Sequence, residues 1–315
     1  MKLHFLGALA MGALLFHCSG SDKTTPVGPT DDAGVDEETG PEDEDSGPQE
    51  GTCPKVSTPK TIGTVSSSAI TEASGLVASK KNPGYFWVHN DSGDSARGFA
   101  IAEDGSLKTI LAFDDKKPSD IEDMTIDDTG SSSYLYFGDI GDNEAARKSI
   151  TIHRVLEPTL GDAELVNAVS EKMTVTYEDG PHNAETLMFD PIDKELFIAT
   201  KILGGPSYIH RLGEFKAGES IVTTKIATVD VDFATGGDIS RDGRYIAIRS
   251  SISKKGSLWI RDEGQSLAEA FAKDPCVIPL ATETQGETLA FLVDNSGYVT
   301  ISEGEKQSLH LALFQ

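Results

Sequence analysis

The sequence predicts an all-β protein built as a single β-propeller, with five blades. From Lys60 onward, short runs of β-forming residues alternate with turns rich in Gly, Asp and Asn. Helical periodicity is confined to at most two turns at 266–272. An acidic residue before an apolar strand also recurs about every fifty residues, a period typical of the four-stranded blade of a propeller. It occurs at Glu72, Glu122, Glu185, Asp238 and Glu287, with spacings of 50, 63, 53 and 49 residues.

The segment 60–65 (KTIGTV) is predicted to close the ring. The last repeat supplies only three strands before the chain ends, so this N-terminal run can serve as its outer strand. That pairing would remove an exposed sheet edge. Six blades are the alternative, because the interval of 63 residues between Glu122 and Glu185 can hide an irregular insertion.

Residues 1–17 are predicted to be a lipoprotein-type signal peptide. The apolar run at 3–16 is too short for a membrane span but typical of a signal-peptide core. The junction before Cys18 resembles a bacterial lipoprotein signal, which implies that Cys18 carries the lipid, although His17 stands where a small residue is usual. Simple secretion is the alternative. We expect an exported protein at the outer membrane or cell surface, otherwise periplasmic or secreted, that contacts the membrane only through its lipid.

Residues 18–52 are predicted to be a disordered acidic tether, followed by the propeller domain at 53–315. Residues 19–50 carry eleven acidic residues and one lysine, with too little apolar surface to form a core. The chain of 315 residues has a formal net charge of −24, which argues against nucleic acid as a partner because phosphate backbones would be repelled. We expect a monomer.

Three cysteines are too few for a disulfide scaffold or a four-cysteine zinc site. Cys53 lies just before the closing strand, and Cys276 begins a predicted outer strand of the fourth blade. In an exported protein these two can form a disulfide near the closure point. The alternative is two unpaired buried thiols.

The propeller geometry predicts a ring of acids around a central channel. The innermost strand of each blade starts, and the second strand ends, at the same rim of that channel. Lys201 and Arg249 are expected to neutralise Glu185 and Asp238 there. The predicted rim residues are Glu72, His89, Asp91, Glu122, Asp123, Asp139, Glu185, Lys201, Asp238, Arg249 and Glu287.

The excess of acid at this rim predicts a bound cation, because neighbouring carboxylates raise one another's pKa when they lack one. Oxygen ligands without a Cys/His cluster favour calcium or magnesium over zinc, and Ca²⁺ is the expected cofactor. The expected ligands are Asp91, Glu122, Asp139 and Asp142. Three of them, Asp91, Asp139 and Asp142, belong to the Gly-containing motifs HNDSGD (89–94) and GDIGDN (138–143), which can turn acids toward one ion. The alternative is that both motifs are Asx-type turns that cap their own backbone.

Several segments resemble a group of secreted bacterial β-propeller proteins, and more distantly the phytase-esterase-like and SdiA-regulated propeller domains. They are EASGL, HNDSGDS, DIEDM, GDIGDN, GGDISRDGRYIAIR, QGETLAF and ISEG. The phytase-like propellers bind calcium along an acidic channel, which implies a similar use here. The basic phosphate-binding cluster of such enzymes is thin in this chain, where Lys201 and Arg249 are the candidates.

The sequence thus favours a binding module that presents a calcium-containing rim to a small ligand or a protein partner. The alternative is a hydrolase that uses the channel carboxylates, either a calcium-dependent, phytase-like phosphoesterase or a glycoside hydrolase. No nucleophile or dinucleotide motif occurs at diagnostic spacing, so no catalytic residue is assigned. A third interpretation is that the acids cap strand amides and bind nothing.

Overall fold

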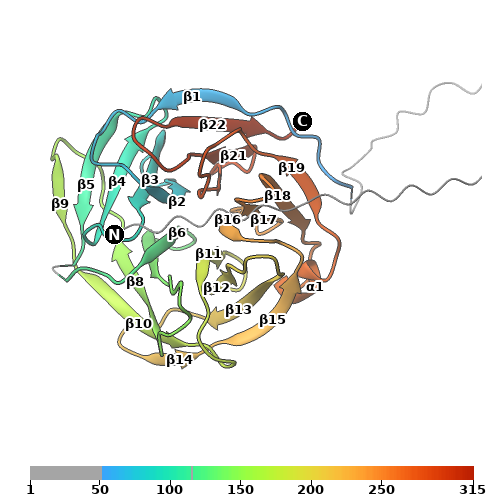
Figure 1. The fold of residues 1–315 in the computed structure, drawn as a ribbon. Coiled ribbons are helices and arrows are strands. Elements are labelled where there is room, and N and C mark those ends of the chain that lie inside the picture. Colours follow the sequence, from blue (N-terminus) through green and yellow to red (C-terminus); the bar gives the residue numbers. More distant parts are fainter. Residues whose placement is uncertain (1–51, 115) are drawn as a thin grey trace, which may run out of the picture. The chain divides into compact units, whose positions relative to one another are not determined.

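The computed structural model describes residues 52–114 and 116–315, and they form a β-propeller of five blades, as predicted (Figure 1). The predictions for the signal peptide, for lipidation at Cys18 and for nearly all of the tether concern residues 1–51, which lie outside the described residues. Within the described ranges, no helix has the length and apolar character needed to cross a membrane.

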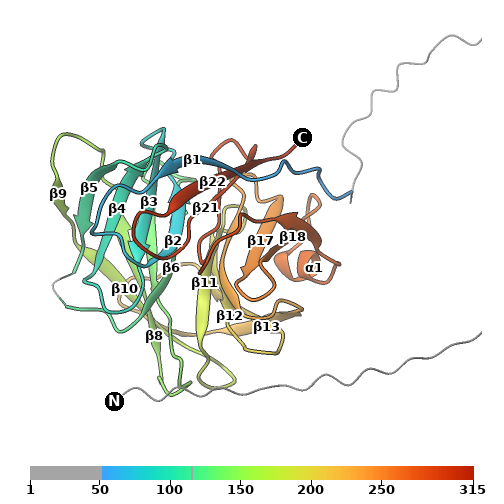
Figure 2. The ribbon, with the colours of Figure 1, turned by 45° about the horizontal axis from the view of Figure 1, so that its top comes forward.

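Each blade is a sheet whose innermost strand lies beside the central axis, and later strands follow outward except at the outer edge of blade 5, where the N-terminal strand lies (Figure 2). Blade 1 contains β2 (Ala73–Ala78), β3 (Tyr85–Asn90), β4 (Arg97–Ala102), β5 (Leu107–Ala112) and β9 (Leu165–Asn167). Blade 2 contains β6 (Ile121–Asp127), β7 (Tyr134–Asp139), β8 (Ile150–Leu156), β10 (Ser170–Thr176) and β14 (Ser220–Val222).

The other three blades have four strands each. Blade 3 contains β11 (Ala184–Asp190), β12 (Glu195–Thr200), β13 (Ser207–Gly213) and β15 (Thr224–Val229). Blade 4 contains β16 (Ala234–Ile239), β17 (Tyr245–Ser250), β18 (Lys255–Ile260) and β19 (Cys276–Pro279), with the short helix α1 (Leu267–Phe271) before β19. Blade 5 contains β20 (Ala290–Phe291), β21 (Gly297–Thr300), β22 (Ser308–Leu313) and β1 (Lys60–Thr64).

The long interval in the repeat forms extra edge strands and no sixth blade. After β8 the chain returns to blade 1, where β9 pairs in parallel with β5, before it completes blade 2 as β10. After β13 the chain does the same one blade later, and β14 pairs in parallel with β10. The return through β9 lengthens the interval between Glu122 and Glu185, and the two returns together connect blades 1, 2 and 3 at their outer edges.

The innermost strands are buried on both faces because neighbouring blades cover them. All residues of β2, β11 and β16 are buried. The strands also approach one another closely, so small residues are needed in places. A Cβ at Gly236 on β16 would collide with the backbone carbonyl of Glu287 in blade 5. Most of the apolar core lies between the blades, where Trp87 of blade 1 packs with Phe137 of blade 2.

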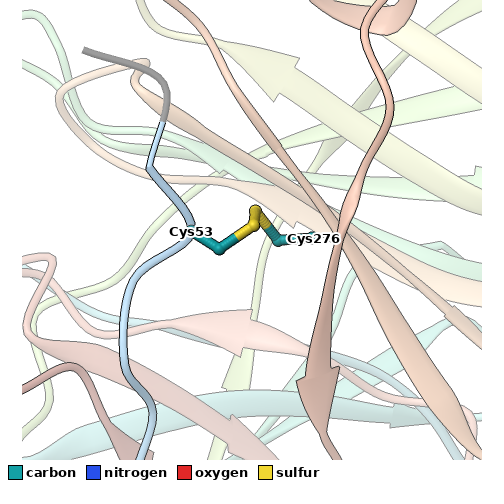
Figure 3. The surroundings of a disulfide bond; sticks show 2 residues. All are labelled: Cys53 and Cys276. Atoms are coloured by element: carbon teal, nitrogen blue, oxygen red, sulfur yellow. A yellow bond between two sulfur atoms is a disulfide. The ribbon is translucent and has the colours of Figure 1, made fainter. Parts of the chain in front are cut away.

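The N-terminal strand closes the ring, as predicted. β1 pairs antiparallel with β22, and the two strands lie side by side at the rim of the ring (Figure 1). Upstream of β1, a disulfide joins Cys53 to Cys276 on β19, with 5.6 Å between the Cα atoms (Figure 3). The segment before β1 is thereby fixed to blade 4, while β1 itself completes blade 5.

Candidate functional site at one end of the axis

The innermost strands share a β-bulge close to their start. In blades 1 to 4, the pairing register with the second strand skips one residue, and a bulge of this kind re-aims the side chain of the extra residue. The corresponding residue of blade 5 follows Gly286, which forms the equivalent bridge with Ser302. The residues at this position are Ser74, Glu122, Glu185, Thr235 and Glu287.

The pairing register shows that two members of the predicted ring of acids, Glu72 and Asp238, were wrong. The equivalent position holds Ser74 in blade 1 and Thr235 in blade 4, and neither Glu72 nor Asp238 occupies it. Glu72 precedes β2 and is exposed. Asp238 lies three residues beyond the bulge position and is fully buried among backbone amides. The spacing of acids in the sequence could not distinguish these positions, because a shift of two or three residues hardly changes a period of about fifty.

Asp123 and Asp238 connect blades and do not face a rim ligand. Asp123 accepts hydrogen bonds from the amides of Met124 (2.8 Å) and Leu187 (2.9 Å), which joins blade 2 to blade 3. Asp238 does the same for blades 4 and 5 by accepting from the amides of Ile239 and Phe291, both at 2.9 Å. Because backbone donors satisfy both carboxylates, we assign them to architecture.

Carboxylates from three blades meet at the end of the axis where the innermost strands begin, which we call the acidic end. One oxygen each from Asp91, Asp120 and Glu122 lies within 4.8 Å of the others, and the same is true of Asp91, Glu287 and Glu303. Asp91 belongs to both groups and thus links the acids of blade 2 to those of blade 5. Asp120 and Glu303 were not among the predicted site residues.

The acids of the acidic end converge because they occupy equivalent positions in different blades. Asp91, Lys201 and Glu303 each follow the residue that pairs at the end of a second strand, so they are structural equivalents in blades 1, 3 and 5. Lys201 forms an ion pair with Glu185, as predicted from their order in blade 3. Asp120 directly precedes β6, and this position before a strand was the available signal for it.

Burial without enough positive charge raises the pKa of the three glutamates at the bulge position, Glu122, Glu185 and Glu287. Burial, reinforced by the charges of Glu185, Asp91 and Asp120, raises the pKa of Glu122 to about 12. Burial also raises the pKa of Glu287 to about 9, with Glu303 as its closest acidic neighbour. Burial raises the pKa of Glu185 only to about 7, because Lys201 opposes the shift.

Two oxygens of the cluster lack a hydrogen-bond partner among the described residues. They are Oε2 of Glu185, whose residue is 4% exposed, and Oδ1 of Asp120. Gly141 lies directly against this cluster, since a Cβ at this position would collide with carboxylate oxygens of both Glu122 and Asp120. A hollow of about 10 Å³ lies between the segments 90–95 and 118–121, roughly the space that one water or ion needs.

Asp139 and Asp142 do not join the predicted calcium ligands. Asp139 accepts from the amides of Ser119 (3.1 Å) and Asp120 (2.9 Å) and forms an ion pair with Arg147 at 2.9 Å. Asp142 accepts from the amides of Ala146 and Arg147 at 3.0 and 2.7 Å. Asp142 thus caps its own turn, whereas Asp139 binds the amides of the segment before β6, and the carboxylates whose oxygens converge are those of Asp91, Asp120 and Glu122.

His89 and Arg249 also lie elsewhere than predicted. His89 is buried between blades 1 and 2, where Nδ1 is 2.7 Å from the Asn90 carbonyl and the ring meets Phe137 edge-on. Burial lowers the pKa of His89 to about 4, so the ring is neutral. Arg249 pairs with Glu283 at 2.9 Å and donates to the Thr288 carbonyl at 2.7 Å; it does not neutralise Asp238.

Arg241 spans the opposite end of the axis, which we call the arginine end. From blade 4, its Nε pairs with Asp128 of blade 2 at 3.0 Å, and its Nη2 donates to the Ala78 carbonyl of blade 1 at 2.9 Å. Blade 4 is adjacent to neither of these blades, so the side chain must cross the axis. Its own amide donates to Asn295 of blade 5 at 2.8 Å.

Neither a protein-family model nor a curated protein matches the chain. Among solved structures, the chain is similar to the PQQ-bound aldose sugar dehydrogenase of Streptomyces coelicolor, with a TM-score of 0.50 and 13% identity over 84% of this chain and 100% of that one. It is also similar to the gluconolactonase XC5397 of Xanthomonas campestris, with a TM-score of 0.46 and 12% identity over 81% and 89% of the two chains. The first likeness shows the β-propeller fold.

Proposed function

We propose that this protein is an exported binding module whose acidic end holds a divalent cation, Ca²⁺ before Mg²⁺. The observation that carries the proposal is the group of oxygens from Asp91, Asp120 and Glu122 within 4.8 Å of one another, with no hydrogen-bond partner for Oδ1 of Asp120 in the part of the chain that the structure describes. Hard carboxylate oxygens at this spacing suit Ca²⁺, which tolerates irregular geometry better than Mg²⁺. A cation there would also offset the burial and the neighbouring negative charges that raise the pKa of Glu122.

The bound cation would give the acidic end its recognition chemistry. Three protein ligands leave coordination positions open to a donor oxygen from outside, such as a carboxylate or hydroxyl of a small ligand or of a partner protein. The second carboxylate group, with Glu287 and Glu303 around the same Asp91, widens the negative surface around that position. The hollow beside Asp91 has room for an ion but not for a substrate, which favours a ligand that docks onto the end of the axis.

The hydrolase alternatives receive less support from the contacts. Lys201 is paired with Glu185 and Arg249 with Glu283, so neither predicted cation is free to bind a phosphoester. Trp87 and Trp259 are fully buried between blades, where they cannot form the aromatic platform that a glycoside hydrolase needs. We therefore rank binding above hydrolysis.

Export and anchoring through Cys18 belong to the same proposal. The disulfide between Cys53 and Cys276 supports an oxidising compartment, because such bonds persist in exported proteins and are rare in the cytosol. The acidic residues at 19–50 would then separate the propeller from the lipid surface.

Thermal unfolding in EDTA, Ca²⁺ and Mg²⁺ tests the cation site. A cation at a hundredfold excess over its dissociation constant adds about 2.7 kcal/mol to the free energy of unfolding. We expect Ca²⁺ to raise the Tm of the wild type and to have no effect on Glu122→Gln. In EDTA the variant should melt above the wild type, because the raised pKa of Glu122 means that the wild type must take up a proton on folding at neutral pH, whereas glutamine is neutral in both states. Glu263→Gln, at an exposed acid in blade 4, is the matched control and should respond like the wild type.

Gly141→Ala provides an independent steric test of the same site. The added methyl group would displace the oxygens of Glu122 and Asp120 without changing any charge, so the Ca²⁺ response should be lost. A wild type that no divalent cation stabilises would refute the cation site. Turnover on phosphoester or glycoside panels that disappears in Glu122→Gln would replace binding with hydrolysis as the function.

A further inference from the structure

A second cluster of metal-ligating side chains lies away from the axis, between the outer parts of blades 2 and 3. Asp179 and His182 belong to the loop that connects β10 to β11, and His210 lies on β13. One ligand atom from each residue lies within 4.8 Å of the other two. Asp179 is exposed, His182 half-buried and His210 fully buried, so the cluster extends from solvent into the interface between the blades.

The two histidine rings face one another in a shared pocket of aromatic residues. Their centroids are 5.3 Å apart, and Tyr177 meets both rings edge-on, at 5.1 Å from His182 and 5.0 Å from His210. Nε2 of His182 is 2.7 Å from Oδ1 of Asp179. The loop 177–183 thus presents a carboxylate and an imidazole to a third ligand that comes from a rigid strand of the next blade.

His210 supplies the observation that points to a ligand. Its Nδ1 is 3.1 Å from the hydroxyl of Thr223, whereas its Nε2 is buried and has no hydrogen-bond partner among the described residues. When Nδ1–H donates to Thr223, Nε2 carries a free lone pair, which is how a metal-binding histidine is normally oriented. Burial also lowers the pKa of His210 to about 4, so the ring is neutral and able to bind a metal.

The surroundings of the cluster are compatible with a cation. The hydroxyl of Tyr177 is likewise buried without a partner among the described residues, and a metal-bound water could satisfy it. Lys225 is the nearby positive charge: its Nζ is 3.6 Å from Oδ2 of Asp179 and lies over the ring of Tyr208. Because Lys225 is partly exposed and its side chain is flexible, it can turn toward solvent when a metal occupies the site.

We propose that Asp179, His182 and His210 form a binding site for a divalent transition metal ion, with Zn²⁺ as the best-suited probe. Two imidazoles and one carboxylate match the ligand preference of Zn²⁺ and its neighbours, whereas Ca²⁺ and Mg²⁺ prefer oxygen alone. Three protein ligands leave a further coordination position open to water or to an outside donor. The ion would also join the loop after blade 2 to the third strand of blade 3.

Titration of Zn²⁺ into the metal-free full-length protein, purified without a polyhistidine tag, tests this site. Calorimetry is carried out with Ca²⁺ present, so that the acids at the acidic end are occupied. We expect one saturable equivalent of Zn²⁺, weakened about 100-fold or more by His182→Gln and by Asp179→Asn, since even the loss of an outer-shell partner costs about 10–100-fold. Neither side chain is fully buried, so both variants should fold, which the denaturation midpoint verifies.

Two controls separate this site from other histidines and from the acidic end. His310→Gln removes a histidine that lies near Thr61 on β1, and Glu122→Gln changes the acidic end; both should bind Zn²⁺ like the wild type. Co²⁺ gives a second readout, because its visible absorption reports nitrogen and oxygen ligands and should disappear in His182→Gln. Absence of saturable Zn²⁺ binding, binding that is unchanged in both Asp179→Asn and His182→Gln, or binding that is lost only in Glu122→Gln would each overturn the proposal.

Discussion

The two ends of the propeller axis use buried acids in opposite ways. At the arginine end, Asp128 is paired with Arg241, whose side chain also donates to a carbonyl across the axis. At the acidic end, Asp91, Asp120 and Glu122 lie together, and burial raises the pKa of Glu122. The first arrangement is balanced within the protein, whereas the second requires protons or a cation from outside. A buried acid therefore indicates a binding site only once its neighbours are known and are found to leave its charge unbalanced.

Arg241→Met should produce the largest change, because it removes the charge that balances the arginine end. Asp128 would remain buried without its partner, and blades 1, 2 and 4 would lose their shared contact across the axis. We expect the free energy of unfolding to fall by about 3–5 kcal/mol, the usual cost of breaking a buried pair. The midpoint of urea denaturation measures it. A loss below about 1 kcal/mol would show that the two ends do not differ in this way.

Asp238→Asn should have the next largest effect. The asparagine can still accept one of the two amide hydrogen bonds, but its NH₂ group would face a backbone N–H that then lacks an acceptor. We expect a loss of about 2 kcal/mol, in the range for an unsatisfied buried donor. The response to Ca²⁺ should be unchanged, because Asp238 joins blades 4 and 5. Loss of the Ca²⁺ response in Asp238→Asn would mean that Asp238 belongs to the cation site at the acidic end after all.

Glu287→Gln tests the acidic end through its pH dependence. The pKa of Glu287 rises from 4.5 to about 9 on folding, so the folded state favours the protonated acid and its ionisation opposes folding. That contribution to stability is fully present below pH 4.5 and is lost as the pH rises toward 9. Glutamine resembles the neutral acid, so in EDTA the stability of the variant relative to the wild type should increase as the pH rises from 4.5 and should be greatest near pH 9.

The quantity to measure is the difference in the free energy of unfolding between the wild type and Glu287→Gln, because His89 and His210 titrate in both proteins. Burial lowers the pKa of each histidine to about 4, so their neutral forms support folding above pH 6.5, and that support is lost as the pH falls toward 4. Subtraction removes this shared contribution. An advantage of Glu287→Gln that is constant between pH 4.5 and 9 would contradict the assignment of a buried, uncompensated acid.

Arg211→Gln should have the smallest effect and sets the scale for the others. Arg211 pairs with Glu195 on the surface of blade 3, and about half of the arginine side chain is exposed. Exposed pairs contribute about 0–1 kcal/mol, so we expect a change of about 0.5 kcal/mol or less in the urea midpoint analysis. An effect comparable to that of Arg241→Met would mean that burial does not separate these pairs.

The sequence was sufficient for the blade count and for the way in which the ring closes. A period near fifty residues survives small insertions, because each blade must bury its faces against its neighbours and therefore repeats the same strand pattern. Only the run at 60–65 was left over in the repeat pattern to supply the missing outer strand of the last blade, and β1 takes that place. The returns through β9 and β14 escaped prediction, because three residues are too few to show the period of a strand and only the middle residue of each is partly buried.

The membership of each site was decided by tertiary structure. The period places an acid near the start of every innermost strand, but a bulge selects which residue faces the axis, and so Glu122 and Glu287 reach the acidic end whereas Asp238 does not. Partners far apart in the chain then determine the role of each charge, as Glu283 does for Arg249. His182 and His210 meet only because β13 returns past the loop after β10. Sequence determines which residue types are present, but register and neighbouring blades determine which atoms are left without a partner.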